Sequence, residues 1–329
     1  MRALEDAFCE YFNIKHAIAM NSATSCLHAA CIACDLGDSE VIVSPYTFSA
    51  SVSCVVMAGA YPKFVDIDPD TFCITPDERD IESDTSAIIP VHLCGHPSDM
   101  DSIMKLAHKY NLKVIEDASQ AIGAKYKGRY VGTIGDCGIF SFNQSKHVST
   151  GEGGILITNN DAIARIARAV RNHAEVADPE LAMVGYNYRL GEIEAILALD
   201  QFKDLDIRTA RRIHLTDYLS EKLSEIDGFT PPVTKADCRH VFYTYAVKYD
   251  ESKVGIPRDE FQDRMIEKGV YFGKNYVKPL YRLPAFRGSE LPVVERMWKE
   301  LIVTDICRYP ATTNDMQEVI DTIKDVICG

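Results

Sequence analysis

Three short motifs hold the residues of this sequence that are best suited to chemistry. NSATS at residues 21–25 is a small polar turn before a stretch of helical composition, so its free N–H groups and the helix dipole could hold an anion. IEDASQ at residues 115–120 places Asp117 at the end of an apolar run, with Gln120 close behind. FSFNQSK at residues 140–146 sets Lys146 after an aromatic run, with no carboxylate among the residues that flank it.

Each motif alone has a simpler structural explanation. Ser22 or Thr24 could cap a helix, Asp117 could cap a helix over residues 118–124, and Lys146 could be a solvated surface lysine. Together, however, the motifs supply an anion cradle, a carboxylate that can keep a ring nitrogen protonated, and an amine that can form a Schiff base. Pyridoxal phosphate requires those three functions. The combination predicts a pyridoxal-phosphate site with Lys146 and Asp117 as its catalytic residues.

The elements that must position these motifs alternate along the first 158 residues. Short runs of aliphatic and β-branched residues span 16–20, 40–44, 63–67, 87–91, 113–117, 138–142 and 154–158. The first five runs are almost continuously apolar, as in strands covered on both faces, and helical stretches separate them. The last two runs lie too close together for a helical crossover, which predicts an antiparallel pair. We therefore expect an α/β fold with a mostly parallel, doubly wound sheet, which binds ligands outside the carboxyl ends of its strands.

The pattern changes after this sheet. Long helical stretches begin near Asn160, and a second α+β unit begins after Gly228, with a strand expected over 240–249 and helices over 258–269 and 319–327. We expect a large cofactor-binding α/β domain over residues 1–205. Residues 206–329 should form a helical connector and a small C-terminal α+β domain.

Composition narrows the class of protein. The formal net charge of -13 argues against a general nucleic-acid or anionic-membrane surface, and no apolar run approaches transmembrane length. The first twelve residues lack a basic segment followed by an apolar core, so we expect no signal peptide. Eleven scattered cysteines suit a reducing cytoplasm, and the pair Cys31 and Cys34 lacks the second ligand pair of a metal site. We expect a cytoplasmic protein without a metal.

The motifs as a set resemble those of the DegT/DnrJ/EryC1/StrS sugar aminotransferases, a branch of the fold-type I pyridoxal-phosphate enzymes. The similar blocks are VIVSPYTFSAS (41–51), KFVDIDPDTF (63–72), the stretch 87–142, KHVSTGEGG (146–154), GYNYRLGEIEA (185–195) and NYVKPLYRLPAF (275–286). The combination of IEDASQ, FSFNQSK and GEGG makes the resemblance specific.

The resemblance implies roles at the cofactor ring. Lys146 matches the lysine that forms the Schiff base and later moves the proton. Asp117 matches the aspartate at the pyridine nitrogen, and Gln120 matches the amide beside the phenolic oxygen of the ring. Phe48 matches the aromatic residue that stacks on the ring.

The resemblance also implies how the cofactor phosphate is held. Ala23 and Thr24, with Ser141, match the phosphate cradle, although a glycine is more usual in the turn where this chain has an alanine. In this family a second subunit completes the cradle, so either Asn187 or Arg189 would act across a homodimer interface.

The implied reaction moves an amino group from glutamate or glutamine to a keto group on a nucleotide-linked deoxy sugar, such as a 4-keto-6-deoxy hexose. A diphosphate on this substrate needs cations, and the loop that carries Lys274, Lys278 and Arg282 could supply them. A solvated loop with incidental charge explains these residues equally well.

Other functions stay open at this point. Sister enzymes of the family carry histidine in place of the lysine and dehydrate the sugar, but here the position is Lys146 and His147 only follows it. Relatives usually begin with a further segment that helps to line the substrate site, which gives some weight to a non-catalytic binding or regulatory protein. No helix-turn-helix or basic arm supports a DNA-binding regulator, and no GxGxxG after the first strand supports a nicotinamide enzyme.

Overall fold

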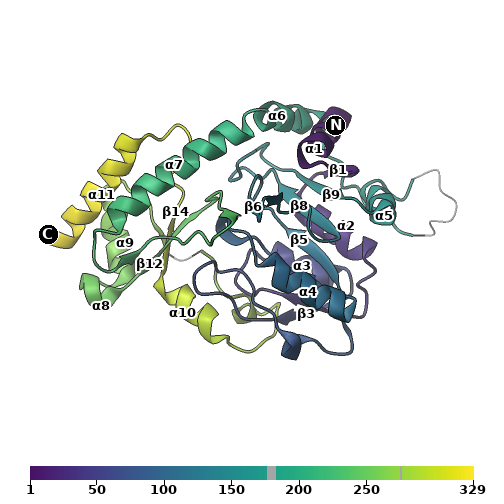
Figure 1. The fold of residues 1–329 in the computed structure, drawn as a ribbon, viewed down its shortest axis with the longest axis horizontal. Coiled ribbons are helices and arrows are strands. Elements are labelled where there is room, and N and C mark those ends of the chain that lie inside the picture. The colour runs from purple at the N-terminus through teal and green to yellow at the C-terminus, as the bar shows by residue number, and fades with distance from the viewer. Residues whose placement is uncertain (176–182, 275) are drawn as a thin grey trace.

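The computed structural model describes residues 1–175, 183–274 and 276–329 (Figure 1). A central sheet contains β1 (His16–Met20), β2 (Glu40–Val43), β3 (Tyr61–Phe64), β4 (Thr85–Ile89), β5 (Lys113–Asp117), β8 (Cys137–Ser141) and β9 (Gly154–Thr158), in the spatial order β1-β9-β8-β5-β4-β2-β3. Only β9 runs antiparallel to its neighbours β1 and β8. The predicted mostly parallel sheet and its antiparallel end are confirmed, although β3 begins two residues before the predicted run.

Helices cover both faces of this sheet, as the apolar strands predict. One face packs against α2 (Ala23–Ala33), α3 (Ala50–Met57) and α5 (Asp161–Arg171). The other packs against α1 (Arg2–Phe12), α4 (Met100–Tyr110) and α6 (Glu192–Phe202). Adjacent residues of β5 show the alternation, because Ile115 packs with α2 and α3 while Val114 packs with α4.

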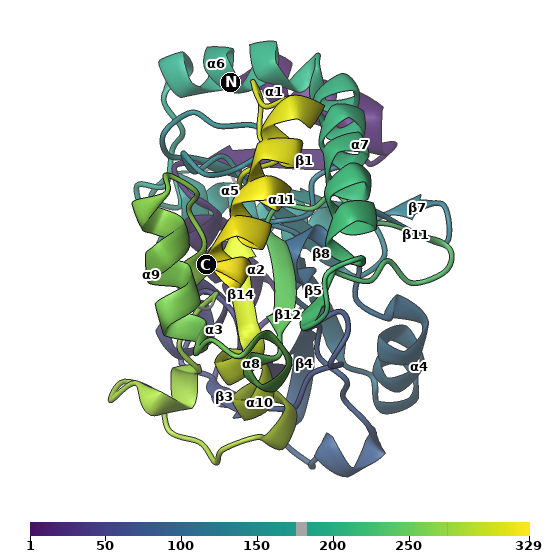
Figure 2. The same cartoon turned by 90° about the vertical axis from the view of Figure 1, so that its left-hand side faces the viewer.

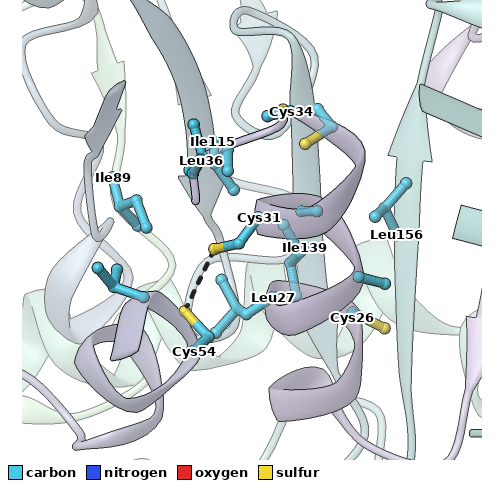
Figure 3. Packing of buried hydrophobic residues seen from close by; sticks show 14 of the residues in the cluster. Cys26, Leu27, Cys31, Cys34, Leu36, Cys54, Ile89, Ile115, Ile139 and Leu156 are labelled. Atoms are coloured by element: carbon cyan, nitrogen blue, oxygen red, sulfur yellow. Dashed lines mark hydrogen bonds between the residues drawn. The ribbon is translucent and has the colours of Figure 1, made fainter. Parts of the chain in front are cut away.

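The core under α2 and α3 is rich in cysteine (Figure 3). Cys26, Cys31 and Cys54 are fully buried among Leu27, Ile139 and other aliphatic side chains, and the sulfur atoms of Cys31 and Cys54 lie 3.8 Å apart. Burial raises the pKa of the Cys26 thiol. Cysteines in this setting act as small apolar side chains, which fits the sequence interpretation.

The C-terminal unit is built on a second, antiparallel sheet with the order β10-β12-β14-β13. Its strands are β10 (Phe229–Thr230), β12 (Tyr245–Tyr249), β13 (Gly273–Lys274) and β14 (Leu301–Thr304). The long helix α7 (Leu205–Leu223) lies beside α11 (Thr313–Cys328), and both pack on this sheet with α9 (Arg258–Glu267) (Figure 2). The predicted division between residues 205 and 206 falls at the start of α7, and we retain it as a proposal.

The remaining elements are short. They are β6 (Lys125–Tyr126), β7 (Arg129–Tyr130), β11 (Cys238–Arg239), α8 (Glu251–Val254), α10 (Pro292–Glu300), and 3₁₀ turns at Glu78–Asp80, Leu93–Gly95 and Leu280–Arg282. An apolar cluster joins α10 and the second sheet to Tyr46, Val91 and Leu93 after the strands of the first. None of the helices within the described residues is long and apolar enough to cross a bilayer.

The strand expected over 240–249 is wrong in its first half. Residues 240–244 are irregular, and their backbone bonds to the turn after β4: Val241 N–H donates to Gly95 O (3.1 Å) and Thr244 N–H to Cys94 O (3.5 Å). This docking satisfies backbone groups that a strand would have paired elsewhere. It also brings a segment of the C-terminal unit to the edge of the first sheet.

Candidate active site

The carboxyl ends of the parallel strands meet at one edge of the central sheet. Because β9 is antiparallel to both of its neighbours, β1 and β8 run in the same direction and both end at this edge, with β9 between them. A cavity of about 570 Å³ opens there. Its lining includes seven of the predicted site residues: Ala23, Thr24, Phe48, Asp117, Gln120, Ser141 and Lys146. The fold therefore brings residues of all three motifs into one cavity.

The first wall of the cavity is the N-terminus of α2. Ser22 caps this helix, since its Oγ accepts from the N–H of Ser25 at 3.0 Å. In the described part of the chain, the N–H groups of Ala23 and Thr24 have no acceptor. An ideal Cβ on Gly154 would lie 2.5 Å from Ala23 N, so only glycine allows β9 to pass this close to the start of the helix. The result is an open pair of N–H donors at the positive end of a helix, which suits a phosphate.

The second wall is the carboxylate of Asp117, which is only 4% exposed. Its Oδ2 accepts from Ser51 Oγ (2.6 Å) and its Oδ1 from the N–H of Ser119 (3.1 Å). Residues 118–124 form turns and not a helix, so Asp117 is not a helix cap. Two hydrogen bonds thus fix the orientation of this carboxylate at the end of β5.

Gln120 is fixed just as firmly. Its Oε1 accepts from the N–H of Cys94 (2.8 Å), and its Nε2 donates to the hydroxyl of Tyr276. Burial raises the pKa of Tyr276 well above its usual value, so this residue stays a neutral phenol. The amide and the phenol together present a neutral, oriented pair of polar groups to the cavity.

Lys146 lines the cavity and contacts Tyr243, a residue from the segment before β12. Its Nζ lies 4.1 Å from the centroid of the Tyr243 ring, and the hydroxyl of Tyr243 shares a 2.8 Å hydrogen bond with Ser145 Oγ. No carboxylate of the described residues pairs with Lys146. Half-buried and lining a cavity, this lysine is not a freely solvated surface residue.

A family model described as the DegT/DnrJ/EryC1/StrS aminotransferase family matches residues 1–324. The chain belongs to this family. Among curated relatives, it is 40% identical to GDP-perosamine synthase of Caulobacter vibrioides over 290 residues, which covers 86% of this chain and 77% of that protein. It is 34% identical over 344 residues to an uncharacterized protein of Methanocaldococcus jannaschii, covering 98% of this chain and 89% of that one.

Solved structures agree with the family assignment. An aminotransferase from Psychrobacter cryohalolentis is 33% identical with a TM-score of 0.91, covering 99% of this chain and 91% of that one. DesV of S. venezuelae, solved in complex with a ketimine intermediate, is 30% identical with a TM-score of 0.92. The match covers 99% of this chain and 88% of that one. The fold is therefore that of the fold-type I aminotransferases.

DegT/DnrJ/EryC1/StrS aminotransferases depend on pyridoxal phosphate, and the cavity fits this cofactor. Free N–H donors at α2 suit its phosphate, the Asp117 carboxylate suits its ring nitrogen, and the Lys146 amine suits its aldehyde. The ring of Phe48, 62% exposed, lies at the cavity wall and is available to stack.

Two of the residues predicted to bind the cofactor lie outside the cavity. Asn187 and Arg189 are exposed in a segment that bridges to the end of β1 and to Asn172, whose Oδ1 accepts from Arg189 Nη1 at 2.6 Å. A residue that acts on a partner's site would be exposed in this way. Their role across a dimer interface stays a prediction.

The predicted diphosphate residues also lie outside the cavity lining. Arg282 pairs through Nη2 with Glu295 (2.6 Å) and Glu290 (2.8 Å), and its guanidinium lies 4.9 Å from the ring of Trp298. These two carboxylates already compensate its charge, which disfavours a role in phosphate binding. Lys278 is exposed and stays a prediction, while the side chain of Lys274 lies outside the described residues.

Several cavity residues were not predicted from the sequence. Asn143, Ser145 and Glu152 belong to the loop around Lys146, and Asn143 Nδ2 donates to Glu152 Oε1 at 2.9 Å. Their polar character inside two recognised motifs was a usable signal. Ser51, Tyr243 and Tyr276 come from distant segments, and only the fold brings them to this edge.

Glu116, next to Asp117, has a different role. It is fully buried, and four donors reach its two oxygens: His92 Nε2 (3.0 Å) and Gly132 N (2.8 Å) at Oε2, and the N–H groups of Ile134 and Gly135 (both 2.6 Å) at Oε1. This carboxylate holds the loop between β7 and β8. It faces the core and does not line the cavity.

We expect Glu116→Gln to lower the free energy of unfolding by roughly 3–5 kcal/mol, because one oxygen becomes an NH₂ group that opposes two buried donors. Urea unfolding of the cofactor-free protein measures this change. Glu82→Gln is the control, since Glu82 pairs with Lys63 at the surface and its loss should cost less than about 1 kcal/mol. Equal unfolding midpoints for the two variants would refute the structural role of Glu116.

Proposed function

We propose that this protein transfers an amino group from glutamate or glutamine to a keto group on a nucleotide-linked deoxy sugar. The observation that carries the proposal is the meeting of Lys146, Asp117 and the open N-terminus of α2 in one cavity. The sugar substrate is supported by relatives: one is named GDP-perosamine synthase, and DesI, solved with its TDP-sugar product, is 27% identical with a TM-score of 0.91.

Different groups of the cavity would hold different parts of the cofactor. When bound, pyridoxal phosphate supplies an electron sink for the carbon that gains or loses a proton. The N–H groups of Ala23 and Thr24 would bind the phosphate, with Ser141 beside them. Asp117 would hold the protonated ring nitrogen, and Gln120 would lie beside the phenolic oxygen.

Lys146 would carry the proton between substrate carbon and cofactor on its Nζ. The Tyr243 ring holds the ammonium form by a cation–π contact and, within the described residues, no ion pair has to break before Nζ moves. Tyr243 is itself held by Ser145, one residue before the lysine. This arrangement positions an amine that must both form a bond and move a proton.

A homodimer would complete the site, with Asn187 or Arg189 from a partner subunit at the phosphate. Lys278 remains the proposed cation of the C-terminal loop for the substrate diphosphate. A cytoplasmic location is likewise a proposal.

The reaction can be tested in two halves by absorption spectroscopy. The purified protein loaded with pyridoxal phosphate should lose the band of the lysine-bound cofactor when glutamate or glutamine is added, and the corresponding 2-oxo acid should form. A 4-keto-6-deoxy nucleotide sugar should then restore the band. A lysine-bound cofactor whose spectrum ignores every amino acid would contradict transamination and favour a binding protein.

A further inference from the structure

A second cleft, of about 520 Å³, shares Lys146 with the candidate active site. Helix α7 and the segment after β14 form much of its wall. Its lining contains five basic side chains and one acidic side chain: Lys146, Arg208, Arg211, Arg212, Arg308 and Asp204. In a chain with a formal net charge of -13, such a local excess of positive charge needs an explanation.

Arg212 is the most buried of these side chains, with 9% of its surface exposed. Its Nη1 donates to the carbonyl oxygens of Phe242 (3.2 Å) and Tyr243 (3.3 Å), and no carboxylate of the described residues pairs with it. Burial, with Arg308 nearby, lowers its pKa to about 10, so it is still charged at neutral pH. A buried, unpaired guanidinium is costly unless an anion compensates it.

Arg308 carries a buried donor without an acceptor. Its Nη2 pairs with Asp305 at 2.5 Å, but its Nε is buried and has no acceptor within the described part of the chain. Buried donors without an acceptor are rare in folded proteins and often indicate a missing ligand or water. The segment before it, Asp305 to Cys307, follows directly after β14 and places this donor in the cleft wall.

His147 also lines the cleft. Its Nε2 donates to Val241 O at 3.0 Å, so the ring needs only its neutral form. Burial lowers its pKa well below the usual value, and the charges of Arg212, Lys146 and Arg308 lower it further. His147 therefore adds no positive charge to the cleft, and the excess comes from the lysine and arginine side chains.

We propose that this cleft binds an oxyanion carried by a substrate, either a carboxylate of the amino-acid donor or a phosphate of the nucleotide sugar. Guanidinium groups bind both kinds of oxyanion with paired hydrogen bonds. The shared Lys146 places such an anion beside the reacting amine. The substrates named here rest on the proposed function, whereas the affinity of the cleft for an oxyanion does not require turnover.

The test titrates two probes, pyrophosphate and the dicarboxylate glutarate, into the protein loaded with pyridoxal phosphate, with calorimetric detection. Arg308→Gln should raise the dissociation constant of at least one probe roughly 10-fold or more, because a charged hydrogen-bond donor is lost. Arg264→Gln is the matched control. It removes the same charge from α9, where Arg264 pairs with Glu260 and lines neither cavity.

The pattern across the probes identifies the source of the anion. If Arg308→Gln weakens only the binding of pyrophosphate, the cleft is assigned to the nucleotide sugar. If it weakens only the binding of glutarate, the cleft is assigned to the amino donor. Weaker binding of both probes shows a general oxyanion site. Unchanged affinity in Arg308→Gln, or a loss confined to Arg264→Gln, overturns the proposal. The same holds if neither probe binds the unmodified protein. Because binding is measured without turnover, a protein that fails to transaminate can still pass this test.

Discussion

Lys146→Ala is expected to abolish transamination, with kcat lowered roughly 10⁴-fold or more, because one side chain supplies both the covalent attachment and the proton transfer. The absorption band of the lysine-bound cofactor should disappear in the same variant. The initial rate of 2-oxo acid formation from glutamate measures the first effect, and a titration with pyridoxal phosphate measures the second.

The variant should remain folded, since Lys146 has no ion-pair partner among the described residues and only its contact with Tyr243 is lost. Lys146→Arg is the matched control: it keeps a cation over the Tyr243 ring but cannot lose a proton near neutral pH. It should be as inactive as Lys146→Ala and keep the unfolding midpoint of the parent. A Lys146→Ala variant that keeps more than about a tenth of the activity would rule out the assigned role.

The residues that could be predicted from the sequence are those that directly follow a strand. Asp117 ends β5, Ser141 ends β8 and Ala23 follows β1, so the alternation of apolar runs was enough to place all three at one edge. Lys146 lies only five residues beyond Ser141. Local sequence decides these positions, because parallel strands share one direction.

The residues that could not be predicted reach the edge through long-range packing. Tyr243 contacts Lys146 because residues 240–244 leave the strand pattern and bond to the turn at Cys94 and Gly95. Its own sequence, rich in aromatic and β-branched residues, favours a strand, and tertiary hydrogen bonds override that preference. Ser51 likewise reaches Asp117 from the start of α3, and the sequence did not indicate that its hydroxyl would meet this carboxylate.

Charge was the least predictable feature. Arg282 was predicted to bind a diphosphate because its neighbours in the sequence are basic, but Glu290 reaches it from the segment before α10 and Glu295 from α10 itself. The arginines of α7 stand at positions 208, 211 and 212, and the sequence does not show which of them is buried. The structure shows that Arg212 among them is buried without a carboxylate partner in the described chain. Pairing depends on partners that sequence spacing does not specify.

Asp117→Asn is expected to lower kcat roughly 10²–10⁴-fold while the protein keeps its cofactor and its stability. The amide has nearly the same shape, and its oxygen can still accept from Ser119 N–H while Ser51 Oγ turns to accept from the new NH₂ group. What is lost is the negative charge that would hold a proton on the ring nitrogen. The lysine attachment and the α2 N-terminus would still retain the cofactor.

Ser51→Ala is the matched control for Asp117→Asn, because it removes one hydrogen bond and leaves the charge in place. It should lower kcat by only about 10-fold or less, because the carboxylate keeps its charge and its bond to Ser119 N–H. The comparison with Glu116→Gln then separates the two adjacent carboxylates. Glu116 is held by four buried donors, so Glu116→Gln should lower the free energy of unfolding. Asp117 faces the cavity, so Asp117→Asn should lower kcat. If Asp117→Asn instead lowered the free energy of unfolding as much as Glu116→Gln and kept its kcat, Asp117 would be a structural residue. The cavity would then lack the carboxylate proposed for the ring nitrogen.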